Sequence, residues 1–196
     1  MEKNRLEAFS DGVLAIIITI MVLELKVPQH AKQLTDLEPI LPVFLSYVLS
    51  FLYVGIYWNN HHHMFQSTKQ VTGGILWANL HLLFWLSLFP FTTGWMGQNH
   101  YAPTPTAIYG FTLLMAAVAY YILQRTIIRQ QGSRSLLAAA VGKDLKAKLS
   151  LLCYVAAIPL AFVSPWIASA LYVVVAFFWL IPDRRIERVI EEREEK

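Results

Sequence analysis

One carboxylate interrupts the apolar N-terminal part of the chain. Asp11 stands within the segment from about Leu6 to Val27, which is apolar from Gly12 to Leu23. A charged side chain inside a membrane span costs about 2.5 to 3.5 kcal/mol on insertion scales, so such a group is usually kept for a function. Asp11 is therefore the first candidate for chemistry, either as a structural hydrogen-bonding group or as part of a proton relay.

Further polar residues are expected at the depth of Asp11. His61 and Asn79 stand as far from the ends of the second and third expected spans as Asp11 stands from the start of the first, roughly 9 Å at 1.5 Å per residue. We expect one polar cluster that holds the first span against the other two, made of Arg5, Ser10, Asp11, Trp58, His61 and Asn79. A structural role is favoured for this cluster. A proton relay through Asp11 and His61 is the alternative.

Three consecutive histidines, 61 to 63, resemble a metal site at first sight. Neighbouring helical residues point about 100° apart, so three in a row do not converge on one ion. A zinc-binding helix would place histidines four residues apart, but Tyr57 and Phe65 occupy those positions relative to His61. We therefore predict no protein-bound metal and no cofactor. A nucleophile elbow is also missing from the sequence, so it does not predict an enzyme.

The elements that position these residues are membrane helices. The chain has 196 residues, of which 56% are hydrophobic and 15% charged, whereas soluble domains carry about 25% charged residues. Residues 39–68, 70–124 and 149–182 contain no Asp, Glu, Lys or Arg. Since a span needs about 20 apolar residues, these stretches hold one, two and two helices. With the N-terminal segment, the sequence predicts an all-α membrane protein of six spans.

Basic residues set the predicted topology. All of the 16 Lys and Arg residues except Lys26 and Lys32 fall on the side that carries both termini. The positive-inside rule therefore places both termini in the cytoplasm, and it explains the basic excess better than nucleic-acid binding does. Residues 1–182 form the predicted six-span unit, and residues 183–196 form a charged cytoplasmic helical tail. The aromatic residues are interpreted mostly as lipid contacts and interface belts.

One face of the N-terminal span differs from the rest of that helix. At 100° per residue, with Ile16 at zero, Ile20 lies at about +40°, Leu23 at about −20° and Thr19 at about −60°. Asp11 lies at about −140°. The helix thus carries a narrow face of large aliphatic residues with one threonine, and its carboxylate points away from that face.

Sequence motifs in the first three spans resemble a known family. Residues 5–11, Arg-Leu-Glu-Ala-Phe-Ser-Asp, fit the R-x-x-x-F-S-D signature of the transmembrane protein 175 family of potassium channels, in which Phe9 is the phenylalanine. Residues 58–61, Trp-Asn-Asn-His, 76–79, Leu-Trp-Ala-Asn, and 89–91, Phe-Pro-Phe, fit as well. At this length the chain is similar to the prokaryotic form, which implies one six-span unit per subunit, a homotetramer and the plasma membrane.

The resemblance implies that four copies of the first span line a pore without a TVGYG filter. Ile16 would form the constriction, followed outward by Ile20 and Leu23, with Thr19 as the polar position beside them. The signature residues would support packing around the pore. The expected function is a potassium-preferring cation channel in membrane lipid, with permeating K⁺ and other monovalent cations as its small partners.

Two further interpretations stay open. The first is a proton-coupled secondary transporter or a proton or cation leak channel, for which Asp11 and His61 would be the residues to test. The second is a membrane-embedded enzyme, which only the histidines favour.

Glu24, at about +80° near the outer mouth, is a candidate for a ring of carboxylates that raises the local cation concentration.

Overall fold

A computed structural model describes all residues except 1, 30, 69, 133–136, 138–144 and 181–196. Every regular element in this described part is helical. Five of the helices are long and apolar enough to cross a membrane once α3 and α4 are taken together as Gly73–Gln98, and the apolar helix Pro165–Leu180 is shorter. The elements are α1 (Lys3–Leu23), η1 (Leu34–Ile40), α2 (Leu41–Gln66), α3 (Gly73–Ser87), α4 (Phe89–Gln98), α5 (Pro103–Gln131), α7 (Leu145–Val163) and α8 (Pro165–Leu180). The predicted tail, 183–196, lies outside the described residues.

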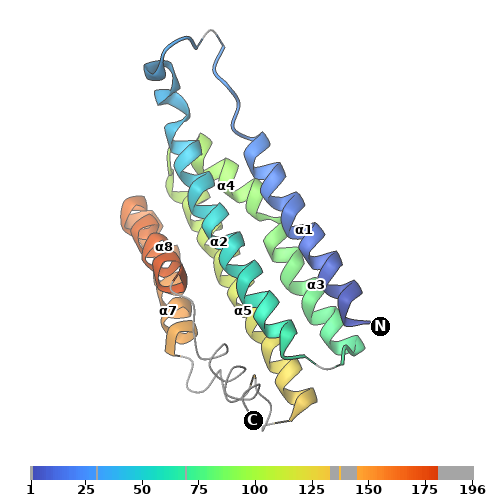
Figure 1. Cartoon of the computed structure of the whole chain (residues 1–196). Helices are drawn as coiled ribbons and strands as arrows, with labels where there is room; N and C mark the ends of the chain where they lie inside the picture. The colour runs from blue at the N-terminus through green and yellow to red at the C-terminus, as the bar shows by residue number, and fades with distance from the viewer. Residues whose placement is uncertain (1, 30, 69, 133–136, 138–144, 181–196) are drawn as a thin grey trace.

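The helices form an elongated bundle (Figure 1). α1 packs against α2, α3 and α4, α5 packs against α3, α4, α7 and α8, and α2 also contacts α4 and α8. The start of α1 lies at the same end of the bundle as the end of α2, because Lys3 Nζ donates to the Gln66 carbonyl oxygen at 3.4 Å. The end of α5 and the start of α7 lie at this end too (Figure 1).

Prolines and polar residues set several helix boundaries. The N-terminal span was expected to reach Val27, but α1 ends at Leu23. Pro28 disfavours the helical conformation at Val27 itself. Ser164 separates α7 from α8, which is the break expected at the Ser164–Pro165 step. The third expected span is interrupted at Leu88, and Pro90 occupies the first turn of α4.

Tyrosine hydroxyls connect the centre of the bundle. Tyr53 Oη donates to the Tyr172 carbonyl oxygen at 2.6 Å, and Tyr154 Oη donates to Tyr53 Oη at 3.2 Å. Ser50 Oγ lies 3.0 Å from Tyr109 Oη. All four tyrosines are buried, so the interpretation of the aromatic residues as mostly lipid contacts is wrong for them. Buried hydroxyls need partners because hydrocarbon offers none.

Close packing of α5 on α8 depends on a glycine. The ring of Tyr172 lies against Gly110, where a Cβ atom would come within 2.6 Å of Tyr172 Cζ. The Tyr172 hydroxyl donates to the Thr106 carbonyl oxygen at 3.2 Å, which holds the ring in place. Small residues at such crossings let membrane helices approach closely.

Gly110→Ala is expected to destabilise the protein by about 1 to 3 kcal/mol, since the added methyl group overpacks a filled core. The free energy of unfolding in detergent measures this effect. Gly55→Ala is the matched control, because a Cβ atom there meets nothing within 4 Å. Equal stability of the two variants would contradict the packing described for Gly110.

Candidate functional site

α1 buries only one stripe of its surface in its own chain. The residues of this stripe recur every three or four positions, as expected for one face of an α-helix. They are Leu6, Ser10, Leu14, Ile17 and Met21. The stripe fixes the rotation of α1 about its axis and therefore fixes which side chains point away from the bundle.

The opposite side of α1 carries large apolar residues without cover from the described part of the chain. The exposed fraction is 59% for Ile16, 44% for Ile20 and 69% for Leu23. Phe9 is exposed on the same side. We call the surface formed by Ile16, Thr19, Ile20 and Leu23 the bare face. Such a face can contact lipid, another helix or another copy of the chain.

Thr19 adds oxygen to the bare face. Its Oγ1 donates to the Ala15 carbonyl oxygen at 2.9 Å, one turn earlier in α1. Since the hydroxyl proton is used inside the helix, the lone pairs of Oγ1 are the part of this group left for outside contacts. The bare face is thus apolar with one oxygen, at Thr19, that can accept a hydrogen bond or contact a cation.

A buried chain of hydrogen bonds ties α1 to α3 and α2. Asn79 Nδ2 donates to Ser10 Oγ at 2.9 Å, and His61 Nε2 lies 2.7 Å from Asn79 Oδ1. Ser10 Oγ donates its own proton to the Leu6 carbonyl oxygen at 2.9 Å. Because Ser10 must therefore accept from the amide of Asn79, the amide oxygen faces His61, and His61 Nε2 must carry a proton.

A second, exposed contact links α1 to α2. Trp58 Nε1 donates to Asp11 Oδ1 at 3.0 Å, and both residues are exposed. The Trp58 ring stacks on His62 with ring centroids 6.2 Å apart. The expected single cluster is therefore divided into a buried chain of Ser10, Asn79 and His61 and an exposed pair of Asp11 and Trp58.

Three other predicted site residues lie apart from the cluster. The Arg5 side chain is exposed and has no polar side-chain partner within the described residues, and Phe9 points to the exposed side of α1. Glu24 is half-buried and accepts a hydrogen bond from Gln98 Nε2 of α4 at 3.4 Å. Glu24 thus leans toward its own chain at the end of α1, beside the bare face.

The sequence interpretation missed the polar lining between α2, α5, α7 and α8. Asn60, Gln124 and Ser150 contribute to it, together with several tyrosines. The signal available in the sequence was the pair Gln124 and Arg125 at the end of an otherwise apolar span. Arg125 was interpreted only as a positive-inside anchor.

Comparisons with known proteins all find ion channels, most of them named for the TMEM175 family. The family model described as endosomal/lysosomal potassium channel TMEM175 matches residues 5–90. A potassium channel of Chryseobacterium sp. (strain P1-3) is 58% identical over 98% of this chain and 100% of that protein. The human endosomal/lysosomal proton channel TMEM175 is 35% identical over an alignment of 83 residues that covers 37% of this chain and 16% of that protein. The crystal structure of a lysosomal potassium-selective channel TMEM175 homolog from Chamaesiphon minutus matches with a TM-score of 0.81 and 27% identity, covering 93% of this chain and 98% of that one.

Asn79→Ala is expected to destabilise the chain by about 2 to 3 kcal/mol, because it leaves Ser10 and His61 buried with an unmade hydrogen bond each. Trp58→Phe is the matched comparison, since it removes one hydrogen bond at an exposed position, where about 1 kcal/mol or less is expected. Denaturant unfolding in detergent, followed by circular dichroism, ranks the two variants. A larger loss for Trp58→Phe would contradict the division into a buried chain and an exposed pair.

Proposed function

Because this chain belongs to the TMEM175 family of membrane ion channels, we propose that it is a potassium-preferring cation channel whose ion path is lined by α1. The observation that carries the proposal is the bare face, whose residues Ile16, Ile20 and Leu23 are left exposed by the described part of the chain. One chain has no pore of its own along this face. A pore requires that copies of α1 meet around an axis.

The proposed assembly is a homotetramer of six-span subunits, with α8 as the sixth span. Four bare faces then point toward a common axis, and each covers apolar surface that would otherwise meet lipid. We place both termini in the cytoplasm of a prokaryotic cell, with residues 1–182 in the channel domain and 183–196 as a charged tail. The positive-inside distribution of Lys and Arg supports this orientation.

Ile16 forms the constriction in this proposal. Four isoleucine side chains around an axis give an apolar ring, and such rings block ions by excluding water from the pore. Ile20 and Leu23 continue the apolar wall along the same face. Conduction then requires a rotation or an outward movement of the four α1 helices, which widens and wets the ring.

Selectivity in this pore depends on dehydration and on oxygen at Thr19. K⁺ gives up water more readily than Na⁺, so a narrow apolar pore favours K⁺ even without a carbonyl filter. The Thr19 hydroxyl donates inside its own helix, so its oxygen can face a passing cation with its lone pairs. The preference for K⁺ over Na⁺ is expected to be modest.

The polar residues hold α1 turned so that its bare face points to the proposed pore axis. The hydrogen bonds of Asn79 with Ser10 and His61 support this role, and the pair of Asp11 and Trp58 adds a contact near the same depth. Arg5 and Phe9 complete the signature as packing residues, with Phe9 directed to the side of the neighbouring copies. Glu24 contributes negative charge beside the outer mouth, where it attracts cations.

Proton conduction is the second candidate function. The vertebrate relatives that match part of the chain are named proton channels. Asp11 is exposed at the level of the buried His61, on the side of α1 that contacts α2, so a proton path along these groups would run beside α1 and not along the bare face. A current that reverses at the proton equilibrium potential in symmetrical K⁺, and is lost in Asp11→Asn, would favour this candidate over potassium conduction.

Ile16→Asn is expected to raise the current and to shift the reversal potential toward zero, because a polar ring wets the constriction and weakens the dehydration barrier. The measurement is the reversal potential of the purified protein in planar bilayers with K⁺ on one side and Na⁺ on the other.

Val22→Asn is the matched control, since Val22 is exposed on α1 but lies about 120° from Ile16 around the helix. The control should keep the reversal potential of the unaltered protein. An unchanged preference for K⁺ in Ile16→Asn would mean that the constriction lies elsewhere.

A further inference from the structure

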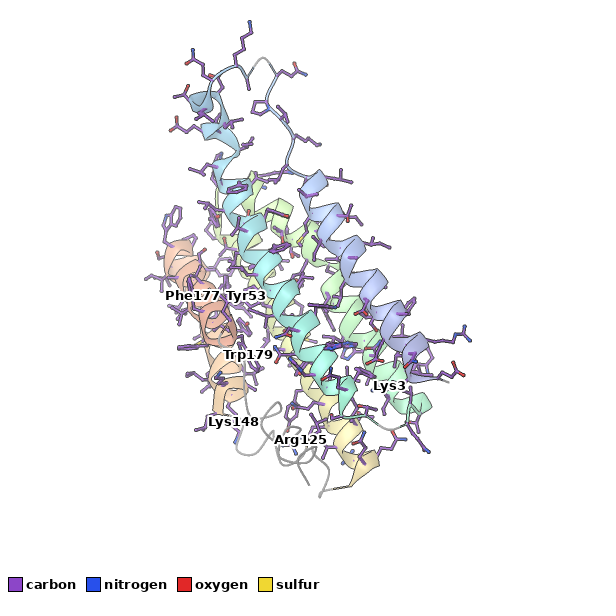
Figure 2. The ribbon with its side chains drawn as sticks, in the orientation of Figure 1. Lys3, Tyr53, Arg125, Lys148, Phe177 and Trp179 are labelled. Atoms are coloured by element: carbon purple, nitrogen blue, oxygen red, sulfur yellow. The ribbon has the colours of Figure 1, made fainter. Side chains whose placement is uncertain are left out.

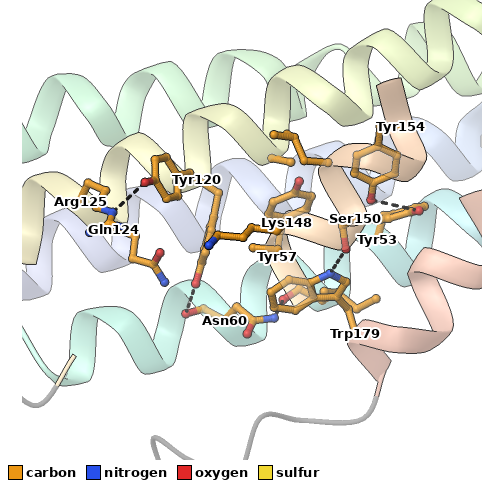
Figure 3. A pocket seen from close by; sticks show the side chains of 15 residues that line it. Tyr53, Tyr57, Asn60, Tyr120, Gln124, Arg125, Lys148, Ser150, Tyr154 and Trp179 are labelled. Atoms are coloured by element: carbon orange, nitrogen blue, oxygen red, sulfur yellow. Dashed lines mark hydrogen bonds between the residues drawn. The ribbon is translucent and has the colours of Figure 1, made fainter. Parts of the chain in front are cut away.

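A cavity of about 390 Å³ lies between α2, α5, α7 and α8 (Figure 3). It is separate from the bare face, because α1 contributes no residue to its lining. Its volume falls within the range of small-molecule pockets, about 300 to 1,000 Å³. The cavity is therefore large enough for a ligand headgroup together with part of an attached chain.

The cavity is positively charged at one end. Arg125 of α5 and Lys148 of α7 both line it, and the described residues of the lining include no Asp or Glu. Both residues lie at the end of the bundle where α5 ends and α7 begins (Figure 2). Two basic groups from different helices without an acidic neighbour among the lining residues favour an anion.

The guanidinium group of Arg125 is held in place. Its Nε donates to Tyr121 Oη at 2.9 Å, and its Cζ lies 5.0 Å from the centre of the Tyr121 ring. The terminal nitrogens keep their donors for an outside partner, since the described residues provide none. The fork of a guanidinium group suits two oxygens of a phosphate.

Gln124 offers a polar group to the cavity. Its side chain lines the cavity and is only 7% exposed, and the amide points into the space beside Asn60 (Figure 3). No residue in the described part of the chain forms a hydrogen bond with this amide. Since the amide is open to the cavity, a ligand there can accept a hydrogen bond from its nitrogen or donate one to its oxygen.

The deeper part of the cavity is apolar and aromatic. Ile56, Ala117 and Leu151 line it beside Tyr53 and Tyr154. Trp179 closes one side, where its Nε1 donates to Ser150 Oγ at 2.9 Å. A free anion would leave this space empty, whereas an acyl chain would fill it.

We propose that this cavity binds an anionic phospholipid, with the phosphate at Arg125, Lys148 and Gln124 and the start of one acyl chain against Ala117 and Leu151. Basic pockets between membrane helices on the cytoplasmic side recognise anionic headgroups in this way. The site places a lipid between α2 and the pair α7 and α8, away from the ion path.

The test is native mass spectrometry of the full chain in detergent, with phosphatidylglycerol, phosphatidylcholine and inorganic phosphate as separate probes. Phosphatidylglycerol is expected to bind about tenfold more tightly than phosphatidylcholine. Arg125→Gln is expected to weaken phosphatidylglycerol binding about tenfold, since it removes a charge-assisted contact. Arg129→Gln is the matched control, because Arg129 is exposed one turn further along α5 and does not line the cavity.

Ala117→Phe separates a lipid from a free anion. The larger side chain fills the apolar part of the cavity, so it is expected to reduce phosphatidylglycerol binding without changing the binding of inorganic phosphate. Arg125 is exposed, so its substitution tests the site even where Ala117→Phe disturbs packing. Equal losses in Arg125→Gln and Arg129→Gln, or displacement of the lipid by inorganic phosphate in equimolar amounts, would overturn the proposal.

Discussion

The rotation of α1 about its own axis is the constraint on which the rest of the structure depends. A buried stripe on one side of α1 packs into the bundle. The hydrogen bond from Asn79 to Ser10 fixes how α1 is turned about its axis against that bundle. Aliphatic side chains alone would let a membrane helix turn, because lipid is as apolar as the bundle. A polar contact at a fixed position resists such rotation, since a turned helix would leave the Asn79 Nδ2 donor without an acceptor in hydrocarbon.

The rotation of α1 determines the hydrogen bonds on its buried side and the exposed residues on its opposite side. On the side of α1 that faces the bundle, His61 must keep a proton on Nε2 to match the Asn79 amide oxygen. The hydrogen bond therefore favours the Nε2-protonated form of His61. On the opposite side of α1, the described part of the chain leaves Ile16 and Leu23 exposed. In the proposed channel, this exposed side is the surface through which copies of the chain meet. A rotation of α1 within its own chain would therefore strain the hydrogen bond between Asn79 and Ser10.

Charge-free stretches and helical periodicity predicted much of this arrangement. The depth of Ser10, His61 and Asn79 placed them near one another, and the structure joins them by hydrogen bonds. Other features depend on which helices pack together, and hydropathy cannot show this in uniformly apolar spans. Gly110 receives the Tyr172 ring, so a tyrosine that could have faced lipid is buried. The polar cavity beside Gln124 likewise exists only because α5 meets α7.

The most direct test of the central claim, that the bare face of α1 lines the ion path, is the modification of cysteines placed along this helix. Ile20→Cys, Leu23→Cys and Val22→Cys would each be made in a Cys153→Ser background, which removes the one native thiol. A charged methanethiosulfonate reagent added during bilayer recording should change the K⁺ current at positions 20 and 23 and leave it unchanged at 22. Equal effects at all three positions, or none at 20 and 23, would contradict a pore lined by this face.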